Sequence, residues 1–392
     1  MRPGFVVAIL LGISACGPLG TPPASPGPEP AYEVIVANES ADVMSRVTFD
    51  PQRGLEVVEM IPVGVMPTEL DSPHGVAVSR DQRFWYVTLG HGTPFGWLWK
   101  FDAHTDTALG RVELGPFPAS LDVTPDGRHA FVVNFNLHGD PVPSTVSVVD
   151  TETMEEVARP TTCVMPHGSR VDAEGEFHYS VCMHSDQLVL IDARTFEVSR
   201  RISLAPGREG LLDLGDTGAH MHAHHADPDR ADPEEHEHHY ETAGEMCSPT
   251  WATPGRGEGA GLVYVPCNRT DVVLEMDSRD GRVVRSFATG EGPYNTEVTP
   301  DGRLLLVTLK GAQAVAVIDL ARGEEAARIP TAQPITHGVV VPSDGRYAFV
   351  TSEAIGSTPG TLDVIDLVTL ERVDSAELSL QPGGIDMIRP TR

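Results

Sequence analysis

Apolar and polar residues alternate along five stretches of the chain in one recurring pattern. Each stretch holds two short segments that are rich in β-branched and aromatic residues, and a turn separates them. The turn is Asp-Gly in three copies, which is a strong local signal for a β-hairpin. The sequence therefore predicts five hairpins of one design, at residues 73–89, 118–134, 166–182, 293–309 and 336–352.

Two further strand segments follow most hairpins, as in "AVAVIDLARGEEAARI", and a sixth copy at 249–267 has a longer Gly-rich turn. Units of four antiparallel strands that recur mostly every 40 to 50 residues are typical of the blades of a β-propeller. We therefore expect an all-β, seven-bladed propeller over residues 32–392. The expected blades have first strands that start at His74, Ala119, His167, Thr250, Tyr294, His337 and Gly383.

The two ends of this repeat region each lack a partner. The region begins with an isolated second strand, "YEVIVAN" (32–38), and ends with an isolated first strand, "GGIDMI" (383–388). A ring of blades leaves only short protected sheet edges when it is closed. We expect these two strands to pair and to close the ring.

The repeat units resemble the YVTN-type β-propeller repeats of the YncE-like family. The resemblance rests on "WYVTL", "AFVVN" and "AFVTS", which are followed by segments such as "VSVVD" and "VAVID". It covers residues 32–392 apart from one insert. It implies a seven-bladed propeller in the cell envelope, and it leaves function open because one fold hosts many functions.

The N-terminus has the features of a secretory signal peptide. Residues 1–15 contain a basic residue, an apolar stretch and small residues directly before Cys16. The segment Ile13-Ser14-Ala15-Cys16 resembles the lipobox of bacterial lipoproteins, which implies cleavage before Cys16 and acylation of that residue; a plain secretory signal is the alternative. Residues 16–31 are rich in Pro and Gly and would form a tether. We expect a lipid-anchored envelope protein, at the outer membrane in a Gram-negative cell.

The net charge of −28 limits the kinds of molecule that the protein can bind. Phosphate backbones would be repelled, so we expect no nucleic-acid partner. The remaining partners are the membrane, through the lipid anchor, and an unknown protein or small-molecule ligand. We expect the protein to be a monomer.

Propeller topology decides which residues share a face. Hairpin turns lie at one end of the ring, so the starts of first strands and the ends of second strands lie at the other end, which we name the top face. An insert at about residues 208–246 also lies there and is too long for an ordinary loop. Seven of the 16 histidines fall in it: His220, His222, His224, His225, His236, His238 and His239.

Two interpretations of this His-rich insert stand beside each other. Short His-rich tracts bind metal, and imidazole ligands favour Cu, Zn or Ni over Ca. The same mixture of His, Asp and Glu is equally typical of a solvated loop without fixed structure. The sequence does not choose between them.

Four other histidines are candidates for a site at the channel mouth, namely His74, His167, His184 and His337. Three of them begin first strands and one follows a second strand, so all map to the top face. A His at the start of a first strand also resembles the repeat pattern of the family. These residues therefore have a structural interpretation as well as a functional one.

Four cysteines remain after Cys16, and each lies at the top of a hairpin arm. An exported compartment permits disulfides, and we expect the pairs Cys163–Cys182 and Cys247–Cys267. The alternative is a soft-metal site, because Met165 and Met183 lie beside the first pair and thiolate, thioether and imidazole together suit copper.

No GxSxG, P-loop or HExxH motif occurs, so the familiar local signatures of catalysis are absent from the sequence. We therefore expect a propeller that binds a ligand or protein partner on its top face, with a His-rich loop that captures transition metal. The alternative is an envelope enzyme or cofactor carrier, lactonase-like or redox, with its site at the channel mouth. Propellers similar to this one include lactonases and domains that carry d1 haem or copper clusters.

Overall fold

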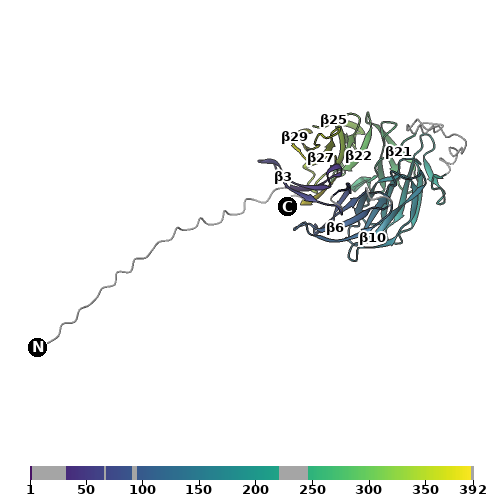
Figure 1. Ribbon diagram of the computed structural model, residues 1–392. Coiled ribbons are helices and arrows are strands. Elements are labelled where there is room, and N and C mark those ends of the chain that lie inside the picture. The colour runs from purple at the N-terminus through teal and green to yellow at the C-terminus, as the bar shows by residue number, and fades with distance from the viewer. Residues whose placement is uncertain (2–31, 66–67, 91–94, 220–245, 390–392) are drawn as a thin grey trace, which may run out of the picture.

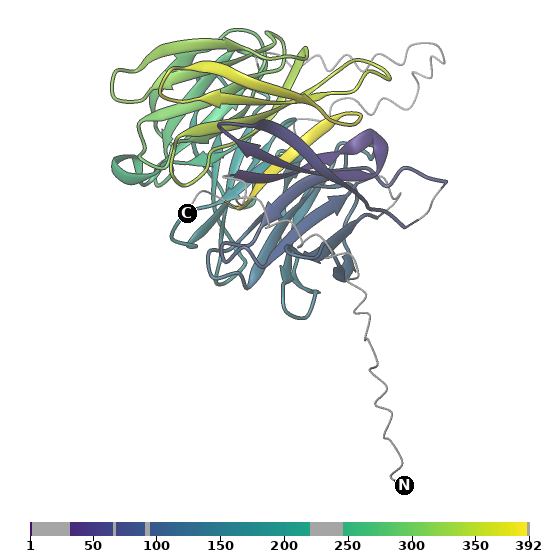
Figure 2. The ribbon, with the colours of Figure 1, turned by 90° about the vertical axis from the view of Figure 1, so that its left-hand side faces the viewer.

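The computed structural model describes Met1 and residues 32–65, 68–90, 95–219 and 246–389. These residues form seven antiparallel sheets that are arranged as blades around a central channel (Figures 1 and 2). The predicted all-β, seven-bladed propeller is therefore confirmed. Short 3-10 turns occur at η1 (Glu39–Ala41) and η3 (Gly257–Gly259). No helix in the described ranges is long and apolar enough to cross a membrane.

The first four blades are antiparallel, and their strands run outward from the inner strand, except that β12 of the third blade pairs with β10. The blade that closes the ring holds β30 (Pro382–Arg389), β1 (Tyr32–Asn38), β2 (Val43–Asp50) and β3 (Gly54–Pro62). The next holds β4 (Pro73–Val78), β5 (Phe84–Leu89), β6 (Trp97–Asp102) and β7 (Ala108–Glu113). The third holds β8 (Pro118–Val123), β9 (His129–Asn134), β10 (Pro143–Asp150), β11 (Glu155–Ala158) and β12 (Thr161–Val164). The fourth holds β13 (Pro166–Val171), β14 (Phe177–Cys182), β15 (Gln187–Asp192), β16 (Val198–Ser203) and β17 (Gly210–Leu212).

The last three blades have four strands each. The fifth blade holds β18 (Thr253–Pro254), β19 (Leu262–Cys267), β20 (Val272–Asp277) and β21 (Val283–Ala288). The sixth holds β22 (Pro293–Val298), β23 (Leu304–Leu309), β24 (Ala314–Asp319) and β25 (Glu324–Pro330). The seventh holds β26 (Ile335–Val340), β27 (Tyr347–Glu353), β28 (Thr361–Asp366) and β29 (Glu371–Glu377).

The ring closes as predicted, because β1 pairs with β30 in one antiparallel sheet. Val34 stands opposite Met387, and Val36 stands opposite Ile385. Both strands contribute apolar residues to the packing between blades, and Ile388 is only 1% exposed. The two ends of the propeller are thus held together by a sheet that neither end could form alone.

The hydrophobic core lies between the blades. One cluster joins the closing blade to the second blade, and Trp85 stacks on Phe101 there with ring centroids 3.8 Å apart. A corresponding apolar cluster lies between the fourth and fifth blades. Burial on both faces of each sheet explains why second and third strands such as β23 and β24 are so apolar.

A threonine in the second strand ties neighbouring blades together. The pairing of β4 with β5 is interrupted between Pro73 and Val76. Thr88 fills the interruption, because its Oγ1 accepts the N–H of Gly75 at 2.8 Å and donates to the carbonyl oxygen of Ala119 in the next blade at 2.6 Å. The same bridge recurs at Thr308 and Thr351. The Thr of the repeat motif therefore has a structural role.

Both predicted disulfides are present. Cys163 is bonded to Cys182, and Cys247 is bonded to Cys267, with Cα atoms 5.9 Å and 4.4 Å apart. Disulfide sulfurs offer no thiolate ligand to a metal. The alternative of a soft-metal site built on these cysteines is therefore wrong.

The sheets differ from the predicted four-stranded blades in two respects. The third and fourth blades gain a fifth strand, and β17 at the start of the insert pairs with β16. The inner strand of the fifth blade is reduced to Thr253–Pro254. Pro249 still pairs with Cys267 through an isolated bridge, so the pairing is interrupted between Pro249 and Thr253.

Candidate functional site

Three predicted histidines from three blades meet at the top end of the central channel. The rings of His74 and His167 have centroids 6.0 Å apart, and those of His74 and His337 are 6.4 Å apart. The ring of Tyr294 lies between the rings of His167 and His337, with centroid distances of 5.6 Å and 4.7 Å. The fourth predicted residue, His184, follows β14 and lies outside this ring-to-ring group.

His167 is held in a single tautomer. Its Nδ1 lies 2.9 Å from the carbonyl oxygen of Thr250, which can only accept, so Nδ1 carries the proton. The Tyr294 hydroxyl then donates to Nε2 at 3.1 Å. Burial lowers the pKa of His167 to about 3, so the ring is neutral at physiological pH. Both ring nitrogens are used in hydrogen bonds, which leaves neither for a metal.

Charged residues complete this buried group. Lys310 Nζ lies 3.9 Å from the centre of the Tyr294 ring and 3.4 Å from Glu353 Oε1. His337 Nε2 lies 3.6 Å from the same Glu353 oxygen. Burial lowers the pKa of Lys310, but Tyr294 and Glu353 outweigh this and raise it overall. We name the set His74, His167, Tyr294, Lys310, His337 and Glu353 the plug.

The plug is packed with aromatic rings. His74 meets Phe117 at 5.7 Å, and His167 meets Phe135 at 4.8 Å, both edge to face. Glu39 lies 3.2 Å from His74 Nδ1. His167 and His337 are 2% and 6% exposed. The predicted histidines thus fill the top of the channel rather than line an open mouth there.

Below the plug the channel widens into a cavity of about 730 Å³. His74 and His337 form its inner end, together with Ser120, Trp251 and Asn295. Its outer end is lined by residues of the first-to-second-strand turns, such as Arg80, Glu174 and Ser343. The cavity therefore opens at the face opposite to the top face. The expectation of a partner on the top face stays a prediction.

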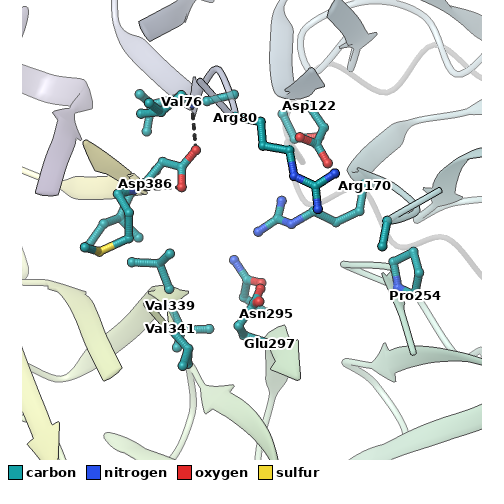
Figure 3. Close-up of a pocket in the computed structure, with 18 of the residues that line it drawn as sticks. Val76, Arg80, Asp122, Arg170, Pro254, Asn295, Glu297, Val339, Val341 and Asp386 are labelled. Atoms are coloured by element: carbon teal, nitrogen blue, oxygen red, sulfur yellow. Dashed lines mark hydrogen bonds between the residues drawn. The ribbon is translucent and has the colours of Figure 1, made fainter. Parts of the chain in front are cut away.

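The cavity wall has a charged sector and an apolar sector. Arg80 and Arg170 point their guanidinium groups into the cavity, with Asp122 beside them and Asp386 across from them (Figure 3). Arg256 forms an ion pair with Glu297 at 2.9 Å. The apolar sector consists of Val76, Val339, Val341, Ile385 and Met387.

Two carboxyl groups in the cavity are tied to the backbone of the next blade. Asp122 accepts the N–H of Val171 at 2.8 Å, and Asp386 accepts that of Val78 at 2.7 Å. Burial raises the pKa of Asp122. Burial, with a smaller contribution from the negative charge of Asp122, raises the pKa of Asp386 to about 7, although backbone N–H groups and the positive charge of Arg170 oppose the rise. Asp386 is therefore poised to change charge near neutral pH.

The metal expectations have different outcomes. The seven histidines of the insert, from His220 to His239, lie outside the described residues. Within the described ranges, no group of three or more His, Cys, Asp or Glu side chains is arranged to hold a metal ion. In the plug, both ring nitrogens of His167 are used in hydrogen bonds, His74 Nδ1 faces Glu39, and His337 Nε2 faces Glu353.

Sequence reasoning did not identify the charged residues of the cavity. Four charged residues occupy the same position in four first strands, three residues after the residue at the channel top. They are Asp122, Arg170, Glu297 and Asp386. A charged residue that recurs at this position of the first strands was the signal. Aligning the first strands by column would have brought these four residues together.

Comparisons with known proteins agree on the fold. No protein-family model matches the chain, and no curated protein matches its sequence. The chain is similar in structure to a protein of unknown function from Desulfotomaculum acetoxidans, with a TM-score of 0.66 and 14% identity over 92% of this chain and 99% of that one. It is also similar to Kuenenia stuttgartiensis hydrazine synthase, with a TM-score of 0.60 and 18% identity over 82% and 92% of the two chains.

A third similar structure is the dihydro-haem d1 dehydrogenase NirN in complex with DHE. Its TM-score is 0.58 at 17% identity, over 95% of this chain and 78% of that chain. Two of these three neighbours are enzymes by their names. At such low identity the likeness establishes the β-propeller fold and not a shared activity.

Proposed function

We propose that the protein is an envelope-anchored binding propeller whose central channel takes up a small organic ligand through the hairpin-turn face. The observation that carries this proposal is the cavity of about 730 Å³, which the plug closes at its inner end. Ligand sites in proteins are concave, have volumes of about 300 to 1,000 Å³ and combine apolar walls with a few polar groups. The cavity has each of these features.

The proposal is tested by a screen of small molecules that compares their effect on the melting temperature of the wild type with their effect on a variant whose channel opening is narrowed. Ala173 and Ser343 are exposed turn residues that line the cavity. The double variant Ala173→Trp/Ser343→Trp narrows the opening without entering the core. We expect panel compounds that raise the melting temperature of the wild type to have no effect on this variant.

The panel contains carboxylates, phosphates, amines, sugars and neutral aromatic compounds. Thr369→Trp, at an exposed turn residue that does not line the cavity, is the matched control and should respond like the wild type. A panel that stabilises the double variant as much as the wild type would contradict binding in the channel.

The lipid anchor belongs to the same proposal and rests on the sequence before Cys16. Acylation would hold the propeller at a membrane, with residues 16–31 as the tether. Incorporation of labelled palmitate into the wild type and its loss in Cys16→Ser tests this. Equal labelling of both proteins would exclude acylation at this residue.

Metal capture by the insert is a second candidate function, supported by its seven histidines. Metal analysis of the untagged full chain, compared with a deletion of residues 220–241, tests it. Cu, Zn or Ni lost with the insert supports this function. Metal that is retained after the deletion, or absent from both proteins, counts against it.

An enzyme or cofactor carrier that uses the same cavity is the alternative function. The observation that favours it is Asp386, because a pKa of about 7 suits proton transfer near neutral pH. NMR spectra of each panel compound after incubation with the protein test it. Conversion that Asp386→Asn abolishes while binding persists would establish catalysis in the channel.

A further inference from the structure

Two arginines of the cavity form no direct ion pair within the described chain, although the charge of Arg170 attracts the carboxyl groups of Asp122 and Asp386 from beyond ion-pair distance. Neither Arg80 nor Arg170 forms an ion pair with a described residue, whereas Arg256 is paired with Glu297. The guanidinium group is always charged and presents planar pairs of donors that match an oxyanion. Both groups point into the same cavity (Figure 3).

Arg170 is fixed in place from behind. Its guanidinium carbon lies 4.9 Å from the centre of the Trp251 ring, and its NH1 donates to the carbonyl oxygen of Ser169 at 3.1 Å. A stacked guanidinium keeps its edge donors available while its face is covered. Arg170 is thus preorganised for a ligand, which lowers the entropy cost of binding.

The nearby carboxyl groups do not replace such a ligand. Asp122 accepts the N–H groups of Val123 and Val171, and Asp386 accepts those of Val78 and Met387. These bonds hold each carboxylate against the backbone of its own and the next blade. With the pKa of Asp386 at about 7, part of the negative charge is also lost at neutral pH.

The inner end of the cavity offers polar groups without partners. Asn295 is 4% exposed, its amide points into the cavity (Figure 3), and its Oδ1 has no hydrogen-bond partner among the described residues. Trp251 Nε1, from a residue at the same end, also lacks a partner among the described residues. Buried polar atoms without partners destabilise a fold, so their presence in a cavity points to a ligand that bonds to them.

The apolar sector of Val76, Val339, Val341, Ile385 and Met387 lines the same cavity. We propose that the channel binds an organic carboxylate with an apolar body, whose carboxylate lies between Arg80 and Arg170 and whose far end bonds to Asn295. This inference rests on the proposed function, because it names the ligand class of the same site. A hydroxyl group at the far end suits Asn295, since it can both donate and accept.

Matched pairs of compounds test the ligand class by isothermal titration calorimetry. The probes are 4-hydroxyphenylacetate, phenylacetate and hexanoate, each compared with the alcohol that replaces its carboxylate by a CH₂OH group. We expect each bound carboxylate to bind at least tenfold more tightly than its alcohol, because charge-assisted hydrogen bonds are the stronger ones. We expect 4-hydroxyphenylacetate to exceed phenylacetate.

Substitutions assign the contact. Arg80→Gln and Arg170→Gln should each weaken 4-hydroxyphenylacetate binding at least tenfold, and Asn295→Ala should remove its advantage over phenylacetate. Arg303→Gln is the control, since Arg303 lies on the same face, is 71% exposed and does not line the cavity. Arg80 is exposed, so its substitution leaves the fold intact even if Arg170→Gln destabilises the protein.

The outcomes separate this inference from the proposed function. The inference is overturned if the carboxylates bind no more tightly than their alcohols. It is also overturned if they bind to Arg80→Gln and Arg170→Gln as tightly as to the wild type. If other panel compounds raise the melting temperature of the wild type and not that of Ala173→Trp/Ser343→Trp, the proposed function stands without the carboxylate inference. If no compound depends on the channel, both fail.

Discussion

The substitution Asp386→Asn tests the electrostatics of the cavity through the stability of the fold. Burial raises the folded-state pKa of Asp386 from 3.8 to about 7. The folded protein therefore binds this proton more tightly than the unfolded chain does. Ionisation of Asp386 removes stability as the pH rises from about 4 to about 7, and the loss is complete above that range.

The magnitude follows from the pKa difference. Each unit corresponds to 1.36 kcal/mol, so the two units between pH 5 and a pKa of about 7 give about 3 kcal/mol. Asparagine has no charge to bury and does not show this loss. It can accept only one of the two backbone N–H groups with its carbonyl oxygen, which costs about 1 kcal/mol at every pH.

Chemical denaturation at pH 5 and pH 9, followed by tryptophan fluorescence, measures the effect. The free energy of unfolding of the wild type minus that of Asp386→Asn should fall by about 3 kcal/mol from pH 5 to pH 9. Asp280→Asn, at an exposed side chain, is the control and should show no such change. Parallel pH profiles for the wild type and Asp386→Asn would refute a buried, proton-binding carboxyl group in the cavity.

Four further predictions concern the scaffold. Removing the Cys247–Cys267 disulfide, which links residues 20 positions apart, should lower the free energy of unfolding by about 3 kcal/mol in chemical denaturation. A thiol assay on the unreduced, unfolded wild type should find no free thiol from either cysteine pair. Thr88→Val should cost about 1 to 2 kcal/mol because it removes the bridge to the next blade, and an unchanged midpoint would disprove that role. Tyr294→Phe should cost a similar amount by leaving its histidine partner without a donor, and unaltered stability would show that the bond contributes nothing. Deleting residues 383–392 should lower the melting temperature, and an unchanged value would refute ring closure by β30.

The fold could be predicted because hairpin formation is a local event. The alternation in "WYVTL" and the Asp-Gly turns fix which residues pair, and the count of first strands then fixes the number of blades. Ring closure followed from the two strands without partners. The fifth strand β17 could not be predicted, because Gly210–Leu212 is too short to show an alternation.

The candidate site was harder to predict for a physical reason. Repeat columns correctly placed His74, His167 and His337 at one end of the channel. Whether they form an open mouth or a filled end depends on Tyr294 and the residues packed around it, which come from other blades. The cavity residues depend in the same way on how seven first strands converge, so a charge such as Arg170 indicates the cavity only when the first strands are compared by column.

The central claim is that a small organic ligand enters the channel from the hairpin-turn face. A crystal structure of the protein with the panel compound that raises its melting temperature most tests this claim directly. We expect the compound in the cavity, between the guanidinium groups of Arg80 and Arg170 and the amide of Asn295. A compound bound on the top face, with only water in the cavity, would contradict the claim.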